Sequence, residues 1–256
     1  MFFGPEGILN VATQNQFGDD NIAATTQQGG ENGSLIIQTG SFNSASITQV
    51  GLQNLSEQVQ NGEANLGEGN QFGDNNQLIQ DQLGGGNVAT ALQGSVLFSS
   101  IGGFVVQIQS GDENMAFAQH EEDDNTIIQI QNGDSNFASV TQNLAFFGGQ
   151  NLVSQLQTGN GNSAQASQEG ATDIFGENNL VVQSQIGDNN QTFSSQNGAN
   201  NVSDILQTGN LNISQDTQTG LSNSTFVTQT GESHLSTIIQ NGTGNSAVII
   251  QSGTGF

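Results

Sequence analysis

Carboxylates and two histidines are the side chains of this sequence that could bind a metal ion or transfer a proton. The carboxylates gather in short groups, such as Asp19-Asp20 and Glu121-Glu122-Asp123-Asp124. Stacked carboxylates can bind divalent cations, whereas carboxylates at water-facing corners keep assemblies apart by charge. We favour the second interpretation, because Asp does not recur at the fixed phase that calcium-binding solenoid repeats require. We therefore expect no metal site and no cofactor.

His120 and His234 stand at places that hold Gln or Asn in the other copies of a repeat. We interpret each as a substitute for the amide rather than as a metal ligand. No Ser–His–Asp arrangement and no pair of carboxylates in a pocket can be argued from the sequence. The prediction is a protein without catalytic residues, not an enzyme.

The repeat itself is the strongest pattern in the chain. Asn, five residues, Gln, one residue, Gly, two residues and again Asn form an eleven-residue unit that occurs 21 times. A fixed period over nearly the whole chain indicates one stacked architecture rather than an ordinary globular domain. We expect the recurring amides to form ladders along the stack.

The expected ladder asparagines are Asn10, Asn21, Asn32, Asn43, Asn54, Asn65, Asn76, Asn87, Asn114, Asn125, Asn136, Asn151, Asn162, Asn179, Asn190, Asn201, Asn212, Asn223 and Asn245. The expected ladder glutamines are Gln16, Gln27, Gln38, Gln49, Gln60, Gln71, Gln82, Gln93, Gln109, Gln131, Gln142, Gln157, Gln168, Gln185, Gln196, Gln207, Gln218, Gln229, Gln240 and Gln251.

Each unit is expected to form one strand and one corner. Five residues separate Asn43 from Gln49, so both side chains lie on the same side of an extended strand. Gly51 follows, and glycine accepts the positive φ that a tight corner requires. The 35 glycines and the lack of a 3.6-residue apolar stripe argue against helix.

A slower, 22-residue period runs through the first. Gln recurs at the fourth place after Asn in alternate units, at Gln58, Gln80, Gln107, Gln129, Gln155 and Gln183. In the same units the second place is large, as at Leu78 and Ile127, and in the intervening units it is small, as at Ala89 and Ala138. This alternation predicts layers of two strands whose large and small residues interdigitate between two sheets. The expected fold is an all-β, two-sheet β-solenoid of stacked β-arches, with about ten layers that stack further into a cross-β fibre.

Three insertions interrupt the period, near residues 94–102, 143–150 and 169–178. Each follows a unit of the small type, so all three are expected at the same corner of the stack. We divide the chain into an N-terminal segment, residues 1–9, and the solenoid, residues 10–256. Five phenylalanines lie in or beside the insertions: Phe98, Phe104, Phe146, Phe147 and Phe175. They could form a lateral contact between fibres, or fold over the corner and bury themselves.

Charge and hydropathy exclude several functions. The net charge is −23 and the chain contains no Lys or Arg, so we expect no binding to nucleic acid or to anionic membranes. No apolar run approaches the roughly 20 residues that span a bilayer, so no membrane insertion is expected. Residues 1–5 lack the features of a signal peptide. Either a leader was removed before this start, or the protein stays inside the cell.

The unit Asn43-x5-Gln49-x-Gly51-x2-Asn54 resembles the curlin repeat, with Asn in place of the leading Ser of that family. The second half of the curlin motif, Asn-x-Ala-x3-Gln, recurs, for example from Asn21-Ile22-Ala23. The resemblance covers about residues 10 to 253. It implies a secreted subunit of curli, the functional amyloid of bacterial biofilm matrix, on the cell surface. It also implies self-assembly, a nucleator and an outer-membrane secretion channel as partners.

The ends of the stack are expected to drive assembly. The last unit contains the inward Ala247 and Ile249, and no polar cap follows it. Because the number of strands is odd, head-to-tail stacking leaves one strand place partly unfilled at each junction. We expect Met1, Phe2 and Phe3 to occupy part of it, with Pro5 suited to an edge because it donates no ladder hydrogen bond.

Asp216 and the function of the stack each allow more than one interpretation. Asp216 falls on an inward place, where an unpaired carboxylate is costly. Either the strand is distorted there or the carboxyl is protonated. The alternatives to a fibre subunit are a curli nucleator, or a monomeric solenoid that acts as an adhesin or ice-binding protein. The outward places do not form the regular Thr ladder that ice binding needs.

Overall fold

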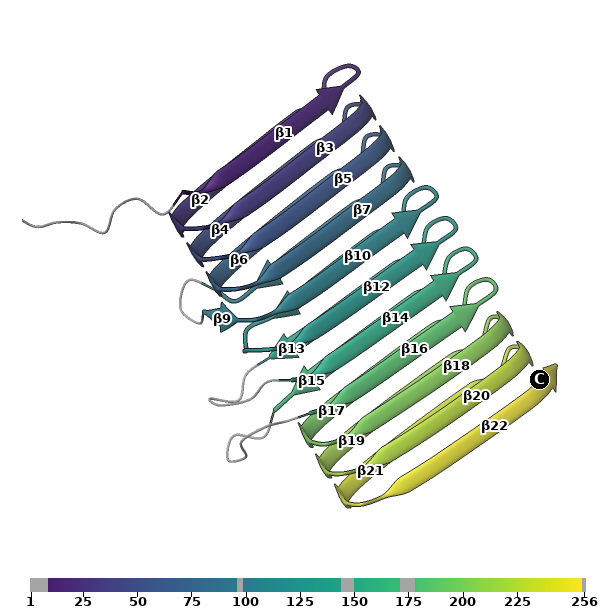
Figure 1. The fold of residues 1–256 in the computed structure, drawn as a ribbon. Coiled ribbons are helices and arrows are strands. Elements are labelled where there is room, and N and C mark those ends of the chain that lie inside the picture. Colours follow the sequence, from purple (N-terminus) through teal and green to yellow (C-terminus); the bar gives the residue numbers. More distant parts are fainter. Residues whose placement is uncertain (1–8, 96–98, 144–149, 171–177, 255–256) are drawn as a thin grey trace, which may run out of the picture.

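Two parallel β-sheets face each other along the whole molecule (Figure 1). The computed structural model describes residues 9–95, 99–143, 150–170 and 178–254, and these contain strands but no helix. The described residues therefore contain no helix that could cross a membrane.

One sheet, sheet A, contains eleven strands in the order β1 (Val11–Phe17), β3 (Gly33–Ser41), β5 (Leu55–Glu63), β7 (Gln77–Gly85), β10 (Phe104–Ser110), β12 (Thr126–Asn132), β14 (Leu152–Thr158), β16 (Leu180–Ile186), β18 (Val202–Asn210), β20 (Ser224–Glu232) and β22 (Ser246–Thr254). The other, sheet B, has the order β2 (Ile22–Gly30), β4 (Ser44–Leu52), β6 (Leu66–Asp74), β8 (Val88–Gln93), β11 (Met115–His120), β13 (Phe137–Asn143), β15 (Ser163–Glu169), β17 (Gln191–Ala199), β19 (Ile213–Leu221) and β21 (Leu235–Thr243).

Consecutive long strands alternate between the two sheets, and each pairs with the strand one full turn away. Ala45 of β4 pairs with Ala23 below it and Gly67 above it, so the register advances by 22 residues per turn. Where an insertion intervenes the register is kept, as between Gln80 and Gln107. The expectation of an all-β, two-sheet solenoid with about 22 residues per layer is confirmed.

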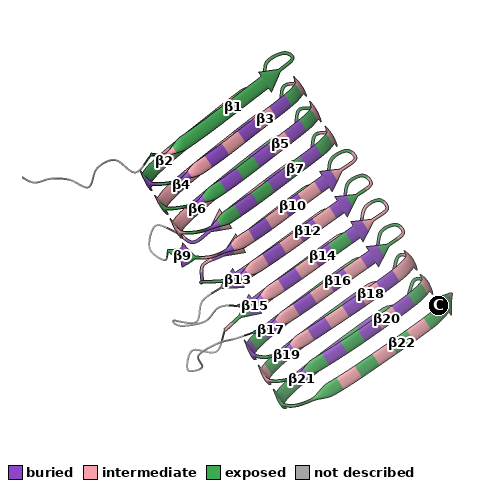
Figure 2. Cartoon of the chain, in the orientation of Figure 1, coloured by how far each residue is buried: buried purple, intermediate pink, exposed green. Residues whose placement is uncertain are grey.

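Alternation of side chains explains why these segments form strands. In β10 the inward residues Val105, Gln107 and Gln109 are buried, and the outward residues between them are half-buried. Figure 2 shows the same alternation as bands along most strands, whereas β1 is exposed throughout because only β3 pairs with it. A period of two places every inward residue against the opposite sheet.

The central core consists of large residues from sheet A packed against small residues from sheet B. Leu78, Val105 and Ile127 of sheet A are fully buried with Ala91 and Ala118 of sheet B. The expected pairing of large against small strands is confirmed in these layers. Near both ends the pattern changes, because sheet B there contributes Ile47 and Ile238. Burying each such aliphatic side chain contributes about 1.5–3 kcal/mol.

Stacked glycines form the corners. Gly51 has a φ of +131°, and a Cβ on it would lie 1.9 Å from the carbonyl oxygen of Gly73, one turn above. Two residues later Gln53 also has a left-handed φ, of 59°. The corner therefore excludes side chains at the Gly place, both because of its backbone conformation and because the next corner lies directly against it.

All three insertions follow strands of sheet B, namely β8, β13 and β15. They therefore interrupt the same corner of the stack, the one that leads from sheet B to sheet A (Figure 1). After the first insertion the chain rejoins the stack at β9 (Ser100–Ile101), which pairs with the end of β6. Ser100 there lies opposite Gly73 and takes the corner place that glycine holds elsewhere.

Candidate functional site: amide ladders and two open ends

The inward glutamines at the end of each strand form hydrogen-bonded ladders. Gln49 Nε2 donates to Gln71 Oε1, one turn above, at 2.8 Å, and to the carbonyl of Gly33 in sheet A at 2.9 Å. Each such side chain therefore joins successive layers and also joins the two sheets. A buried amide with both kinds of bond satisfied stabilises the fold, whereas an unpaired one would destabilise it.

In sheet A this ladder is continuous. It runs through Gln16, Gln38, Gln60, Gln82, Gln109, Gln131, Gln157, Gln185, Gln207, Gln229 and Gln251, with Nε2–Oε1 distances of 2.7 to 3.0 Å. In sheet B it runs from Gln27 through Gln49 and Gln71 to Gln93, and again from Gln142 through Gln168, Gln196 and Gln218 to Gln240.

The asparagines at the start of each strand fasten the corners. Asn43 Nδ2 donates to the carbonyl of the corner glycine Gly62 at 2.9 Å. Its Oδ1 accepts both the backbone N–H and the Nδ2–H of Asn65, one turn above. The amide supplies its donor and its acceptor on two different atoms, whereas an ionised carboxylate would have no donor.

A second Gln ladder lies inside the layers of sheet A. It consists of Gln58, Gln80, Gln107, Gln129, Gln155 and Gln183, which are joined Nε2 to Oε1. These residues carry the 22-residue alternation of the sequence, and they are not among the ladder residues expected from the eleven-residue repeat. Gln183 ends the ladder by donating to Ser194 Oγ at 3.1 Å, while Gln58 Oε1 at the other end is buried without a donor among the described residues.

His120 interrupts the sheet B ladder instead of continuing it. It is fully buried in a Gln place, but Gln142 Oε1 above it has no hydrogen-bond partner among the described residues. Its Nδ1 lies 3.3 Å from Ser100 Oγ and from the carbonyl oxygen of Glu122. Burial lowers the pKa of His120 to about 4. The prediction that His120 simply replaces Gln is therefore wrong for the hydrogen bonds of the ladder, which stop at His120.

His234 reproduces the hydrogen-bond donor of the Asn side chain but not its acceptor. Its Nε2 lies 3.0 Å from the carbonyl oxygen of Gly253 and 3.1 Å from that of Thr230, as the Nδ2 of Asn does in other units. Imidazole has no counterpart of the amide oxygen that accepts two bonds from the next Asn. His234 lies at the start of β21, the last strand of sheet B, so no further strand of this chain requires that acceptor.

Asp216 lies inward in a regular strand. It pairs in register with Ser194 and Ile238, and its side chain is fully buried. Thr225 donates a hydrogen bond to Oδ2, while Oδ1 has no partner among the described residues. Desolvation raises the pKa of this carboxyl, and the hydroxyls of Ser203 and Thr225 partly oppose that shift. Of the two explanations considered from the sequence, distortion of the strand is excluded.

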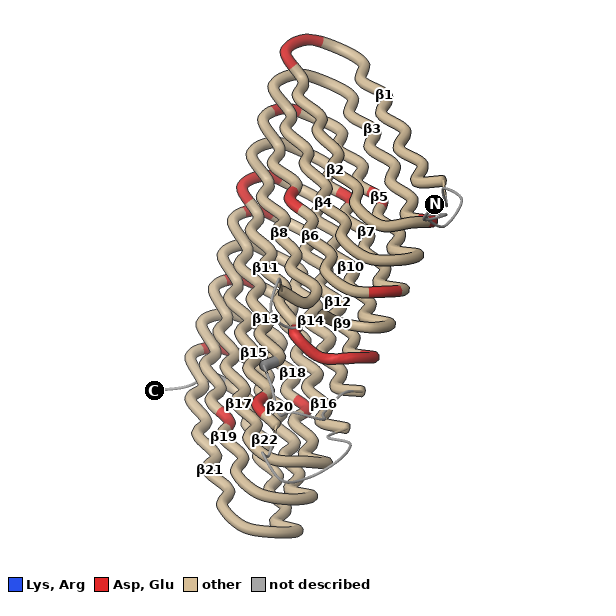
Figure 3. Tube along the Cα trace, turned by 90° about the vertical axis from the view of Figure 1, so that its left-hand side faces the viewer, with Lys and Arg blue, Asp and Glu red and all other residues tan. Residues whose placement is uncertain are grey.

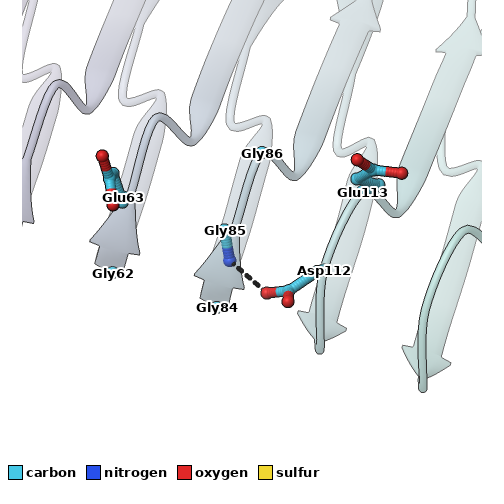
Figure 4. Close-up of a pocket in the computed structure, with 7 residues that line it drawn as sticks. All are labelled: Gly62, Glu63, Gly84, Gly85, Gly86, Asp112 and Glu113. Atoms are coloured by element: carbon cyan, nitrogen blue, oxygen red, sulfur yellow. Dashed lines mark hydrogen bonds between the residues drawn. The ribbon is translucent and has the colours of Figure 1, made fainter.

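Acidic residues mark the corners of the stack (Figure 3), where several of them accept backbone hydrogen bonds. Asp112 Oδ1 accepts the N–H of Gly85, one turn below, at 2.7 Å, and Asp134 does the same for Asp112 at 2.9 Å. The hollow beside Gly85 is lined by glycines and by the carboxylates of Glu63, Asp112 and Glu113 (Figure 4). Of these carboxylates, Asp112 holds the corner backbone through its hydrogen bond with Gly85.

The two ends of the stack differ in the groups that they present. Every Gln in the ladders donates toward the C-terminal end, so Gln251 there has one Nε2–H that no described residue accepts. At the other end Gln16 Oε1 accepts no hydrogen bond from any described residue. Among the described residues, Asn245 Oδ1 likewise accepts no hydrogen bond from a further layer at the C-terminal end, and the N–H of Asn10 has no acceptor at the other end. The ends are therefore complementary, donor to acceptor.

Both terminal strands belong to sheet A, because the number of long strands is odd. Among the described residues, β22 pairs only with β20 and β1 only with β3, so one edge of each has no described strand beside it. Ala247 and Ile249 of β22 are half-buried against the last core cluster. Met1, Phe2, Phe3 and Pro5, which were expected at the junction, lie outside the described residues.

Of the five phenylalanines expected near a lateral contact, the structure describes Phe104 alone, and Phe98, Phe146, Phe147 and Phe175 lie outside the described residues. Phe104 begins β10 and is half-buried on the outer face of sheet A. It pairs with Gln77 below and Thr126 above, so it belongs to the sheet rather than to the inserted segment.

Comparison with known proteins agrees with this architecture. The family model of the curlin associated repeat matches residues 18–51 and 220–253. Each match begins and ends on a corner glycine, and the two lie toward opposite ends of the stack. No curated protein matches the chain. The spacing of Asn, Gln and Gly, the two-sheet solenoid and the two matches to the family model together support a curlin-family repeat protein.

Proposed function

We propose that this chain is a structural subunit of an extracellular, curli-like amyloid fibre that grows by head-to-tail stacking of whole solenoids. The complementarity of the two ends carries the proposal. Gln251 offers a donor where Gln16 of a second copy offers an acceptor, and Asn245 offers an acceptor where Asn10 offers a donor. Like ends related by a two-fold axis would run antiparallel to each other, so neither the Gln ladder nor the Asn ladder would continue in register. The contact is therefore heterologous and does not close, which is the condition for a filament.

The open strand edges favour the same mode of growth. A soluble solenoid covers its last strand, because unpaired N–H and C=O groups template the pairing of another chain. Here β22 carries Val248 and Ile250 on its outer side, exposed at 63% and 72%, and its inward Ile249 covers the last layer only in part. A second copy would bury Ile249 and complete the hydrogen bonds of that edge.

Within the junction, we place β1 of the incoming copy on β22, so that sheet A continues into sheet A. Asn245 at the start of β22 retains the acceptor that the next Asn uses, whereas His234 at the start of β21 lacks it. This arrangement leaves one strand place of sheet B between β21 and the next β2. Residues 1–9 precede β1 and would reach that place first, with Met1, Phe2 and Phe3 covering it.

The proposed fibre also suggests where the protein acts and which partners it needs. A curli-like subunit acts outside the cell, so we propose passage through an outer-membrane secretion channel and growth from a nucleator on the cell surface. The role in biofilm matrix and adhesion belongs to the same proposal. A monomeric solenoid that acts as an adhesin is the competing function, and it requires discrete particles about 50 Å long, ten layers at about 4.8 Å.

Electron microscopy of two matched variants tests the proposal. Ile249→Asp places a charge on the inward side of the terminal strand, and Val248→Asp places the same charge on its outward side. Both variants should form solenoids, as judged by circular dichroism. Wild type and Val248→Asp should form long unbranched fibres, whereas Ile249→Asp should remain short. Discrete wild-type rods, or equal fibre growth in both variants, would overturn head-to-tail stacking.

A further inference from the structure

The outer face of sheet A is apolar along four consecutive strands, β10, β12, β14 and β16. We call the first three outward residues of each strand the sheet A outer patch. Of its twelve places, nine hold apolar side chains and three hold Thr or Ser. One row along the stack contains Val106, Ile128 and Val182, with Ser154 between the last two, and the next row contains Ile108, Ile130 and Leu156. These side chains are half-buried by their neighbours, apart from Leu156, which is exposed at 39% (Figure 2).

No charged side chain lies within this patch, although the chain has a net charge of −23. The first carboxylates on the same face stand just beyond it, Asp81 on β7 and Asp204 on β18. Asp81 lies between Val59 and Ile108 in its row, and burial raises its pKa. Most other acidic residues lie at the corners (Figure 3). Two such patches could therefore approach without bringing carboxylates directly together.

In the same layers, the outer face of sheet B is less apolar than that of sheet A. The first three outward places of β8, β11, β13 and β15 hold apolar side chains in five of twelve cases. The outward residues of β15 are Ser163, Gln165, Ser167 and Glu169. The apolar rows are thus a property of one sheet and not a general consequence of the repeat.

The size of the patch indicates how it can act. Four strands about 4.8 Å apart, with outward residues over about 17 Å of each strand, give a flat area of roughly 300 Å². A stable interface between two proteins buries about 800 Å² on each. One patch is therefore too small to hold two isolated subunits together. In a stacked fibre the patch recurs in every subunit on the same side, and the contacts of many subunits then act together.

We propose that the sheet A outer patch is the surface through which two fibres of this protein pack side by side, sheet A against sheet A. The inference rests on the proposed function, because it requires the fibre. A second fibre fits best because its rows have the same 4.8 Å spacing and can interdigitate at the roughly 10 Å distance of packed sheets. It also brings an uncharged patch of its own. An anionic lipid surface fits less well, because the chain has no Lys or Arg to bind it.

A matched pair of triple variants tests the proposal. Val106→Thr, Ile128→Thr and Val182→Thr make the central row polar without changing charge or strand propensity. The control carries Val88→Thr, Met115→Thr and Phe137→Thr on the outer face of sheet B, which likewise form one row. Fibres of each are compared by electron microscopy for the fraction that run as pairs.

Wild-type and control fibres should pair, and pairing in the sheet A variant should fall at least about tenfold while single fibres still grow. Pairing that persists in the sheet A variant, or equal loss in the control, would overturn the inference. Wild-type fibres that remain single would overturn it as well, with the proposed function intact. A wild-type protein that forms no fibres would overturn both.

Discussion

The imidazole of His120 occupies the space that a side chain at position 103 would fill. A Cβ on Gly103 would lie 2.1 Å from His120 Cε1 and 2.5 Å from its Nε2. Position 103 is an Asn place of sheet A and position 120 a Gln place of sheet B. Both ladders are broken in this layer, because Asn125 Nδ2 and Gln142 Oε1 have no partners among the described residues. The two departures from the repeat therefore compensate each other in volume.

This compensation predicts strong coupling between the two positions. Gly103→Asn alone should destabilise the protein by about 1–3 kcal/mol, because the new side chain is forced against the ring. His120→Gln alone leaves space unfilled. The double variant should be more stable than either single variant, because it can restore both ladders. Urea unfolding followed by circular dichroism gives the coupling free energy, expected at about 2 kcal/mol. Additive effects would show that the two positions are independent.

Stability should also depend on His120 in acid. Its pKa is about 4 when folded and 6.5 when unfolded, so between these values the unfolded chain binds more protons. The contribution of His120 is complete above pH 6.5 and is lost as the pH falls toward 4, by up to about 3 kcal/mol. Burial of Asp81, Asp204 and Asp216 acts in the opposite direction. The difference in unfolding free energy between wild type and His120→Gln isolates the histidine, and a difference independent of pH would contradict its burial.

Asp216→Asn should stabilise the protein at neutral pH. The amide can still accept the hydrogen bond from Thr225, and it removes a buried charge, for a gain of about 2 kcal/mol. Because the folded pKa of Asp216 is raised, its destabilising effect grows as the pH rises above 3.8 and vanishes below it. Asp188→Asn is the control, since Asn210 already occupies the same corner place one turn above. Equal effects of the two changes would show that burial of Asp216 is not the cause.

Deletion of residues 1–9 tests the proposed filling of the junction. If Met1, Phe2 and Phe3 cover the strand place left in sheet B, fibres without them should elongate more slowly and dissolve at lower guanidinium concentration. Replacing the three residues by Ser in the full-length chain controls for chain length. Unchanged growth and fibre stability would show that the junction does not use this segment.

The regular part of the fold follows closely from the sequence. The spacing of Asn43, Gln49 and Gly51 places two amides on one side of a strand and a glycine at the corner, and the structure has both amides buried. The alternation of large Leu78 with small Ala89 indicates two sheets, because large and small residues must face each other to fill one core, and in the structure Leu78 lies in one core cluster with Ala91. These features depend on short-range geometry that repeats, so each copy supports the next.

Other features depend on contacts that the period does not describe. Gly103 and His120 belong to different sheets and are brought together by the insertion before β10, so their compensation cannot be seen from either repeat alone. The common direction of the ladders, with Gln Nε2 always donating toward the C-terminal end, arises from side-chain rotamers that spacing does not fix. That direction is what makes the ends complementary. The sheet A outer patch can be recognised only when the strand order is known, because it shows that strands of alternate repeats are neighbours in the sheet.

Helical reconstruction of the fibres by electron cryomicroscopy tests head-to-tail stacking most directly, through the axial rise per subunit. Each subunit contributes eleven strands to sheet A, so stacking of β1 on β22 gives a rise of about 53 Å at about 4.8 Å per strand, with every subunit in the same orientation. A rise of about 50 Å with a half-turn between subunits would instead place β1 on β21 and pair every strand. That result would contradict the junction described here, and particles without a helical repeat would contradict the fibre itself.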